Sequence, residues 1–304
     1  MTTQPLTRIT IGAGLIAGTA AVLLADVAIA GWSGLPIAPG FWILLAGSLL
    51  VGCREFFRML RGRGYPCRPV IGMAFVGLLL AIAWIEIHRP WNILPWLYGR
   101  GLELYLLLIV ALVFTTFLVE ILSIERANRD VSQALASVGW TVLVVLTVGL
   151  LGVFLAKVRF LSPDPFEGLM YLALTLGVVK ASDIGAYAIG STLGRHRLVP
   201  KLSPKKTVEG VAGAMAVGVA MAVSIGCGWG RFTWQEMIVF GLAVSISGVL
   251  GDLAESLMKR ACGVKDSGRI PTFGGALDIL DSMLSASPVA YLVLVVLTGP
   301  VPMG

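Results

Sequence analysis

The sequence predicts an all-α protein that crosses a membrane about nine times. Of its 304 residues, 57% are hydrophobic and only 13% are charged, which leaves too little polar surface to enclose a water-soluble core of this size. The apolar residues form runs close to the length of about 20 residues that a membrane-spanning helix requires. Charged and turn-forming residues separate these runs, and the Lys and Arg residues gather in alternate connecting segments.

Each run is predicted to be a helix because it is long, apolar and bounded by a turn or charge signal. In chain order the runs cover 9–30, 36–53, 69–87, 101–120, 134–156, 168–190, 208–228, 236–257 and 283–302. The signals between the first six are glycines in 31–34, arginines in 54–68, a proline in 88–91, charges in 125–129 and prolines in 162–165. The first run continues past Asp26 to a helix-like length, so we expect a spanning helix there and not a cleaved secretory signal.

No internal repeat or low-complexity linker divides the chain. We therefore treat 1–304 as a single integral membrane domain. Within it, 1–160 holds the N-terminal transmembrane helices, and 161–304 holds the C-terminal helices and loops that carry the candidate chemistry. The four cysteines have no spacing typical of a zinc site or a disulfide framework.

The basic residues set the orientation, because Lys and Arg are retained on the cytoplasmic side. The segments on the same side as the N-terminus hold 17 of them, and the segments on the other side hold five. We therefore expect a multi-pass protein of the cell membrane, the inner membrane in a bacterium, with a cytoplasmic N-terminus. The positive charge lies in short loops and forms no continuous face or tail, which argues against nucleic acid as a partner.

Charged residues inside the predicted spans indicate where the chemistry lies. A charge at the centre of a spanning helix costs about 2.5–3.5 kcal/mol on insertion scales, so each one calls for a reason. Lys180 and Asp183 are three residues apart on one face of a helix, and a structural ion pair and a functional site both remain open for them. Asp252 and Glu255 repeat this spacing, and Lys259 follows four residues later.

A second pair of carboxylates, Asp278 and Asp281, precedes the last predicted span. These residues and Asp252 lie on helices that meet at the cytoplasmic side, where their carboxylates repel one another unless a cation lies between them. We therefore expect a divalent metal held by Asp252, Asp278 and Asp281, with the active site facing the cytoplasm.

The neighbouring loop is basic, and it contains Lys205 and Lys206 before Thr207. Carboxylate-held Mg²⁺ beside Lys and Arg side chains is the usual means of neutralising a polyphosphate. The pattern thus favours phosphoryl or nucleotidyl transfer, although retention of positive charge in the cytoplasm also explains the two lysines. The sequence has no Walker A motif, so a P-loop nucleotide site is not supported.

Two long motifs resemble the phosphatidate cytidylyltransferase (CDP-diacylglycerol synthase) family. The segment SLMKRACGVKDSGRIPTFGGALDILDS at 256–282 is similar to the family signature S-x-x-K-R, K-D, Pro, Gly-Gly and D-x-x-D. The segment SDIGAYAIGSTLGRHRLVPKLSPKKTVEG at 182–210 resembles its D-x-G-A-Y and S-P-K-K-T-x-E-G stretch. The resemblance covers about residues 165–290. It departs at Phe273 and Ile279, where the family commonly has His and Arg.

The resemblance implies that CTP and phosphatidic acid react to give CDP-diacylglycerol and pyrophosphate. It also implies Mg²⁺ with a second, monovalent cation such as K⁺, a lipid-bilayer environment and a homodimer. As phosphate contacts or catalytic residues it implies Lys205, Lys206, Lys259, Arg260 and Lys265, with Ser203, Ser256 and Asp266 as further members. Lys180 and Asp183 would line the cavity that the lipid headgroup enters. Gly274 and Gly275 fit a backbone that approaches a phosphate closely, or an ordinary loop before the last helix.

Two alternatives remain. A CTP-dependent polyprenol or phytol kinase would keep the fold but need a general base near the acceptor hydroxyl. A membrane transporter would place charges along a path to both faces and show repeat symmetry, whereas the charges of this sequence gather at one face.

Overall fold

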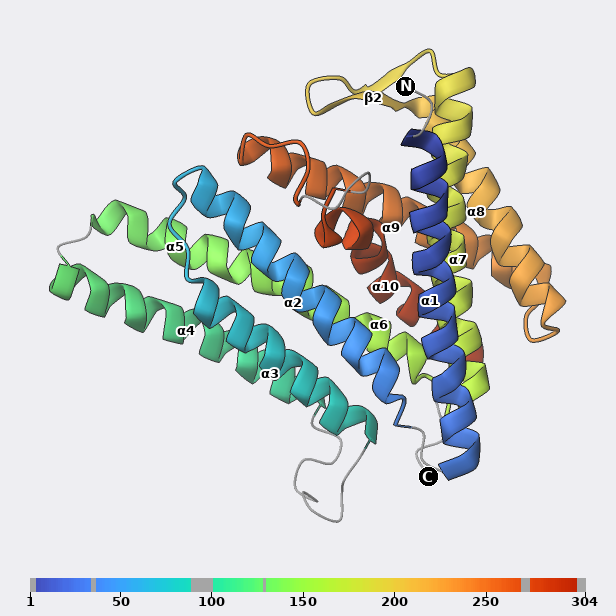
Figure 1. Ribbon diagram of the computed structural model, residues 1–304, viewed down its shortest axis with the longest axis horizontal. Helices are drawn as coiled ribbons and strands as arrows, with labels where there is room; N and C mark the ends of the chain where they lie inside the picture. The colour runs from blue at the N-terminus through green and yellow to red at the C-terminus, as the bar shows by residue number, and fades with distance from the viewer. Residues whose placement is uncertain (1–3, 34–36, 89–100, 128–129, 269–273, 300–304) are drawn as a thin grey trace.

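The computed structural model describes residues 4–33, 37–88, 101–127, 130–268 and 274–299, which form nine long helices and one small β-hairpin (Figure 1). The helices are α1 (Gln4–Ser33), α2 (Pro39–Gly62), α3 (Pro69–His88), α4 (Gly101–Ala127), α5 (Val131–Val144) continuing through the π-helical η2 (Val145–Leu150) into α6 (Leu151–Arg159), α7 (Pro165–Thr192), α8 (Val208–Gly228), α9 (Trp234–Ala261) and α10 (Ala276–Thr298). Eight are long and apolar enough to cross a membrane, and the apolar part of α1 is shorter. The prediction of an all-α polytopic membrane protein with about nine helices is confirmed. The cytoplasmic location of the N-terminus stays a prediction.

Polar residues cap the N-termini of α7, α8 and α9, three of the C-terminal helices. The Asp164 carboxylate accepts hydrogen bonds from the first backbone N–H groups of α7, and Pro165 occupies the first helical position. Thr207 caps α8 through the N–H of Gly210. Thr233 and Glu236 form a reciprocal capping box at α9. These bonds satisfy N–H groups that have no partner within the helix.

The last helix begins earlier than the sequence indicated. The predicted span started at residue 283, whereas α10 begins at Ala276, so Asp278 and Asp281 lie within its first two turns. The physical reason is that the Asp278 carboxylate accepts a hydrogen bond from Gly275 N at 2.7 Å, which caps the helix. The charged first turns lowered the hydropathy that defined the predicted boundary.

Strands β1 (Arg197–Val199) and β2 (Ser203–Thr207) form the antiparallel hairpin between α7 and α8. Arg197 pairs with Thr207 and Val199 pairs with Ser203. The sequence analysis expected only a basic loop here. Strand β2 consists of the Ser-Pro-Lys-Lys-Thr motif, so the hairpin places both lysines beside the start of α8.

Helix α10 joins two groups of helices. In Figure 1, α2 to α6 form one slanted group, α1, α7 and α8 form another, and α9 and α10 lie between them. Leu280 and Leu284 of α10 belong to a buried apolar cluster shared with α2, α3 and α6. Ala286 and Ala290 belong to a second cluster shared with α7, α8 and α9. The residues at the start of α10 therefore lie where the two groups meet.

Candidate active site

A cavity of about 810 Å³ lies among α7, the hairpin, α8, α9 and α10. Five cations and five carboxylates line it: Lys180, Arg197, Lys205, Lys206 and Lys259, with Asp183, Asp252, Asp266, Asp278 and Asp281. Nine of these ten residues were predicted from the sequence, and they come from segments up to 101 positions apart. The two motifs thus meet in one charged cavity.

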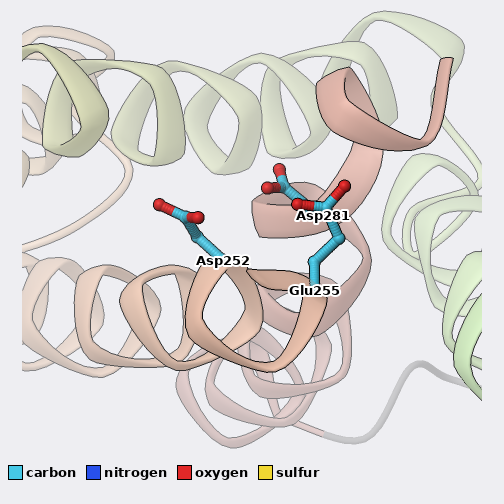
Figure 2. A group of neighbouring side chains, drawn as sticks. All are labelled: Asp252, Glu255 and Asp281. Atoms are coloured by element: carbon cyan, nitrogen blue, oxygen red, sulfur yellow. The ribbon is translucent and has the colours of Figure 1, made fainter. Parts of the chain in front are cut away.

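Three carboxylates converge at the junction of α9 and α10. Asp252 and Glu255 lie on neighbouring turns of α9, and Asp281 lies across from them on α10 (Figure 2). Each offers one oxygen, and these oxygens lie within 4.8 Å of one another. Glu255 is almost completely buried, and its Oε1 has no hydrogen-bond donor among the described residues. Asp281 has no ion-pair partner in that same part of the chain.

This cluster fits a divalent metal ion. Carboxylate oxygens are the ligands that Mg²⁺ prefers, and like charges this close repel unless a cation lies between them. The buried, unfilled Oε1 of Glu255 is a further acceptor for an ion. Asp252 and Asp281 were predicted ligands, whereas Glu255 was noted only for its helical spacing. The spacing of three residues from Asp252 was the available signal.

Asp278 lies beside this cluster and has other partners. Its Oδ1 lies 2.6 Å from Lys259 Nζ. Its Oδ2 accepts hydrogen bonds from Ser267 N and Oγ, both at 2.9 Å, and from Gly275 N. Both oxygens are therefore occupied by protein donors. The structure brings Asp278 to the cavity but does not group it with Asp252 and Asp281.

Lysines separate the carboxylates of the cavity. Lys259 Nζ also lies 2.5 Å from Glu255 Oε2, and Lys206 Nζ lies 2.8 Å from Asp252 Oδ2. Lys180 Nζ contacts Asp183 at 3.2 Å and the Ile279 carbonyl oxygen at 3.3 Å. The Lys206 contact links the hairpin directly to the carboxylate cluster. A ligand that binds there meets positive charge on the hairpin side and negative charge on the α9 and α10 side.

The other predicted residues lie outside the cavity lining. These are Ser203, Ser256, Arg260, Lys265, Gly274 and Gly275. Arg260 is exposed and its Nη1 lies 3.5 Å from the Val264 carbonyl oxygen. Gly274 has a φ of 83°, which favours glycine, and this geometry agrees with the loop interpretation. Phe273 lies outside the described residues.

Sequence reasoning missed Arg197 as a cavity residue. Arg197 begins β1, and Gly190 and Gly194 beside it also line the cavity. The only signal was its place in a basic loop, which does not distinguish it from Arg195. The pairing of Arg197 with Thr207 in the hairpin supplies the missing information.

The fold and the site define an integral membrane protein whose charged cavity suits a phosphate-bearing substrate. A model of the cytidylyltransferase family matches residues 9–297. Phosphatidate cytidylyltransferases of Mycobacterium leprae and Synechocystis sp. are 32% and 34% identical to this chain. The alignments cover 86% and 85% of this chain and 82% and 90% of those proteins. The corresponding protein of Staphylococcus aureus is 34% identical over 72% of this chain and 79% of its own length.

The chain belongs to the cytidylyltransferase family. This confirms the resemblance drawn from the two motifs, and with it the expectation of a nucleotidyltransferase.

Proposed function

We propose that the chain is a phosphatidate cytidylyltransferase that makes CDP-diacylglycerol and pyrophosphate from CTP and phosphatidic acid. The observation that carries this proposal is the cavity in which Asp252 and Asp281 face the lysines of the hairpin, with the buried Glu255 beside them. The relatives that match most of the chain bear the name of this activity. We place the cavity on the cytoplasmic side, where CTP is available, as the distribution of Lys and Arg predicts.

The reaction requires positioning and charge neutralisation more than proton removal. An oxygen of the lipid phosphate is already anionic, so it attacks the α-phosphorus of CTP without a strong base. A new phosphorus–oxygen bond forms, and the bond to the pyrophosphate leaving group breaks with its electron pair retained by pyrophosphate. The protein must hold the two phosphates in line and offset the growing negative charge.

The hairpin cations take the leaving group in this proposal. Arg197, Lys205 and Lys206 lie on one side of the cavity, where three positive charges spread over the β- and γ-phosphates. Lys180 lies deeper along α7, beside Asp183, and we assign it to the phosphate of the lipid. Lys259 keeps Glu255 and Asp278 neutralised and so fixes the negative wall.

Asp252, Glu255 and Asp281 would hold Mg²⁺, which supplies charge neutralisation on the triphosphate oxygens when it is bound. Within the described residues this is the one group of three acidic side chains close enough for such a role. A second, monovalent cation and a homodimer remain expectations from the family resemblance. Sedimentation of the purified protein in detergent tests the homodimer.

The assay follows labelled CTP with phosphatidic acid and Mg²⁺, using the detergent-purified protein and its Asp281→Asn variant. We expect the wild type to form CDP-diacylglycerol and pyrophosphate in equal amounts. We expect Asp281→Asn to lose at least about 100-fold in turnover, the scale of losing one electrostatic contact to the transition state. Asp130→Asn is the matched control, because Asp130 is an exposed carboxylate that caps α5 away from the cavity.

A phytol or polyprenol acceptor tests the alcohol-kinase alternative in the same assay. Transfer of the γ-phosphate to that alcohol, without any liponucleotide, would overturn the proposed function. Equal activity in Asp281→Asn and wild type would overturn the assignment of the carboxylate cluster.

A further inference from the structure

A buried carboxylate of the N-terminal half contacts the start of α10, beside the candidate active site. Glu55, on α2, is 5% exposed. Its Oε2 accepts a hydrogen bond from Leu277 N at 3.0 Å and lies 3.1 Å from Ser267 Oγ. Leu277 is in the first turn of α10, where backbone N–H groups lack partners within the helix. A side chain from α2 therefore caps the helix that carries Asp281.

Two glycines near the start of α10 pack closely around this carboxylate. A Cβ atom on Gly268 or on Gly275 would overlap the carboxylate oxygens of Glu55. Only glycine fits at these two positions with the backbone where it is. The contact is thus a specific arrangement of α2, the two ends of the loop and α10, and it goes beyond general apolar packing.

Ser267 connects Glu55 to the lysine that lies between the acidic groups. The Ser267 hydroxyl lies within hydrogen-bonding distance of both Glu55 and Asp278. Asp278 in turn contacts Lys259, and Lys259 contacts Glu255 of the metal-binding cluster. The contacts run without a gap from α2 to that cluster. Asp281 lies one helical turn after Leu277, whose N–H group donates a hydrogen bond to Glu55.

We propose that Glu55 is a positioning residue for the proposed reaction, holding the first turn of α10 and Ser267 so that Asp278 and Lys259 keep Glu255 and Asp281 in place for the metal ion. Glu55 does not line the cavity, so it acts through these residues and not on the substrate. This inference rests on the proposed function for its kinetic effect, but its structural part is measurable without turnover.

The test compares Glu55→Gln with Glu120→Gln. Both residues are buried carboxylates of the N-terminal half, with 5% and 2% exposure, but Glu120 lies on α4 and pairs with Arg68. Both variants are expected to lower the unfolding temperature. Only Glu55→Gln is expected to raise the half-saturating Mg²⁺ concentration and lower kcat per folded molecule, each by about tenfold, as changes behind metal ligands typically do. The KM for phosphatidic acid should stay within about twofold of wild type, because the residue does not touch the substrate.

Two measurements keep the inference separate from the reaction. Hydrogen exchange in the peptide at the start of α10 should speed up in Glu55→Gln and not in Glu120→Gln. The rise in unfolding temperature on adding Mg²⁺ should shrink in Glu55→Gln alone. Glu55→Asp, which keeps the charge, should recover part of both signals.

The outcomes distinguish the two ideas. If wild type makes no CDP-diacylglycerol but the exchange and Mg²⁺ results hold, the proposed function fails and the role of Glu55 stands. If exchange, Mg²⁺ dependence and kcat per folded molecule all match those of Glu120→Gln, Glu55 contributes only to packing and the inference is overturned.

Discussion

Buried charges in the two halves of the molecule are arranged in opposite ways. In the N-terminal half, Arg68 makes two hydrogen bonds with Glu120, at 2.6 and 2.9 Å, and a third with Ser123. On the opposite ends of these helices, Glu86 accepts from both Lys157 and Tyr105 at 2.8 Å. Both of these acids have a base and a hydroxyl as partners, since Glu120 also accepts a hydrogen bond from Ser137 Oγ.

In the C-terminal half, three carboxylates converge on one another in addition to their contacts with lysines. Asp252, Glu255 and Asp281 converge within 4.8 Å, and the lysines beside them do not contact Asp281. A closed pair leaves no buried charge uncompensated in a medium that solvates ions poorly. An open group of like charges is retained where a ligand completes it. The difference supports a structural role for the Arg68 and Glu120 pair and a ligand-binding role for the three carboxylates of α9 and α10.

The sharpest test of this difference is Glu255→Gln compared with Asp278→Asn. If Glu255 is a ligand, its amide variant should raise the Mg²⁺ requirement by about 100-fold, the upper end of the effect seen for metal-site changes. Asp278→Asn should raise it less and should lower the unfolding temperature more, because a neutral amide replaces the carboxylate that Lys259, Ser267 and Gly275 contact. A Mg²⁺ titration of turnover with thermal unfolding checks both. The reverse order would restore Asp278 as the ligand.

The hairpin should show an effect on substrate affinity. Lys206→Met removes the cation that contacts Asp252, and we expect the KM for CTP to rise about tenfold, since a hydrogen bond to a charged group contributes about 1.5–3 kcal/mol. Lys201→Met is the control, because Lys201 is in the exposed turn of the same hairpin and does not line the cavity. Equal effects of both variants on CTP affinity would mean that the hairpin acts only by general positive charge.

Arg260 tests whether charged residues outside the cavity lining contribute to turnover. It follows Lys259 but is exposed and lies outside the lining, so Arg260→Ala should change kcat/KM by less than about threefold, as expected for a surface position. Steady-state kinetics with CTP as the varied substrate measures this. A loss of tenfold or more would support the phosphate contact that the family resemblance implies.

The N-terminal pair should affect stability and leave turnover unchanged. Glu120→Gln leaves Arg68 without its charged partner, and breaking a buried pair typically costs about 3–5 kcal/mol. We expect a lower unfolding temperature with unchanged kcat per folded molecule. The double variant Arg68→Met, Glu120→Leu should recover much of the stability, because it removes both charges together. If stability does not recover, the pair contributes to stability beyond the mutual compensation of its two charges.

The number of helices could be predicted from the sequence, and so could the meeting of the two motifs in one site, because hydropathy and charge are local properties. The sequence could not choose between Glu255 and Asp278. The pairs Asp252/Glu255 and Asp278/Asp281 have the same spacing, and only the rotation of α9 against α10 decides which oxygens meet. The earlier start of α10 contributes, since it places Asp281 a turn deeper than predicted.

The hairpin and Glu55 were beyond sequence reasoning for different reasons. Strand β2 contains a proline and two lysines and has no alternation of apolar residues, so no strand pattern identifies it. Glu55 finds its partners Ser267 and Leu277 at separations of 212 and 222 residues. No local pattern contains a contact of that range.

Because of this separation in sequence, Glu55 is synthesised well before its partners Ser267 and Leu277. At 5–20 residues per second, a ribosome needs roughly 10–45 s to add the residues between Glu55 and Leu277. During this interval α2 is already synthesised, and its carboxylate still lacks both Ser267 and Leu277 as partners. The contact between α2 and α10 therefore closes only after the last helix has entered the bilayer, so a chain that stops short of α10 carries most of the membrane helices and cannot assemble the site.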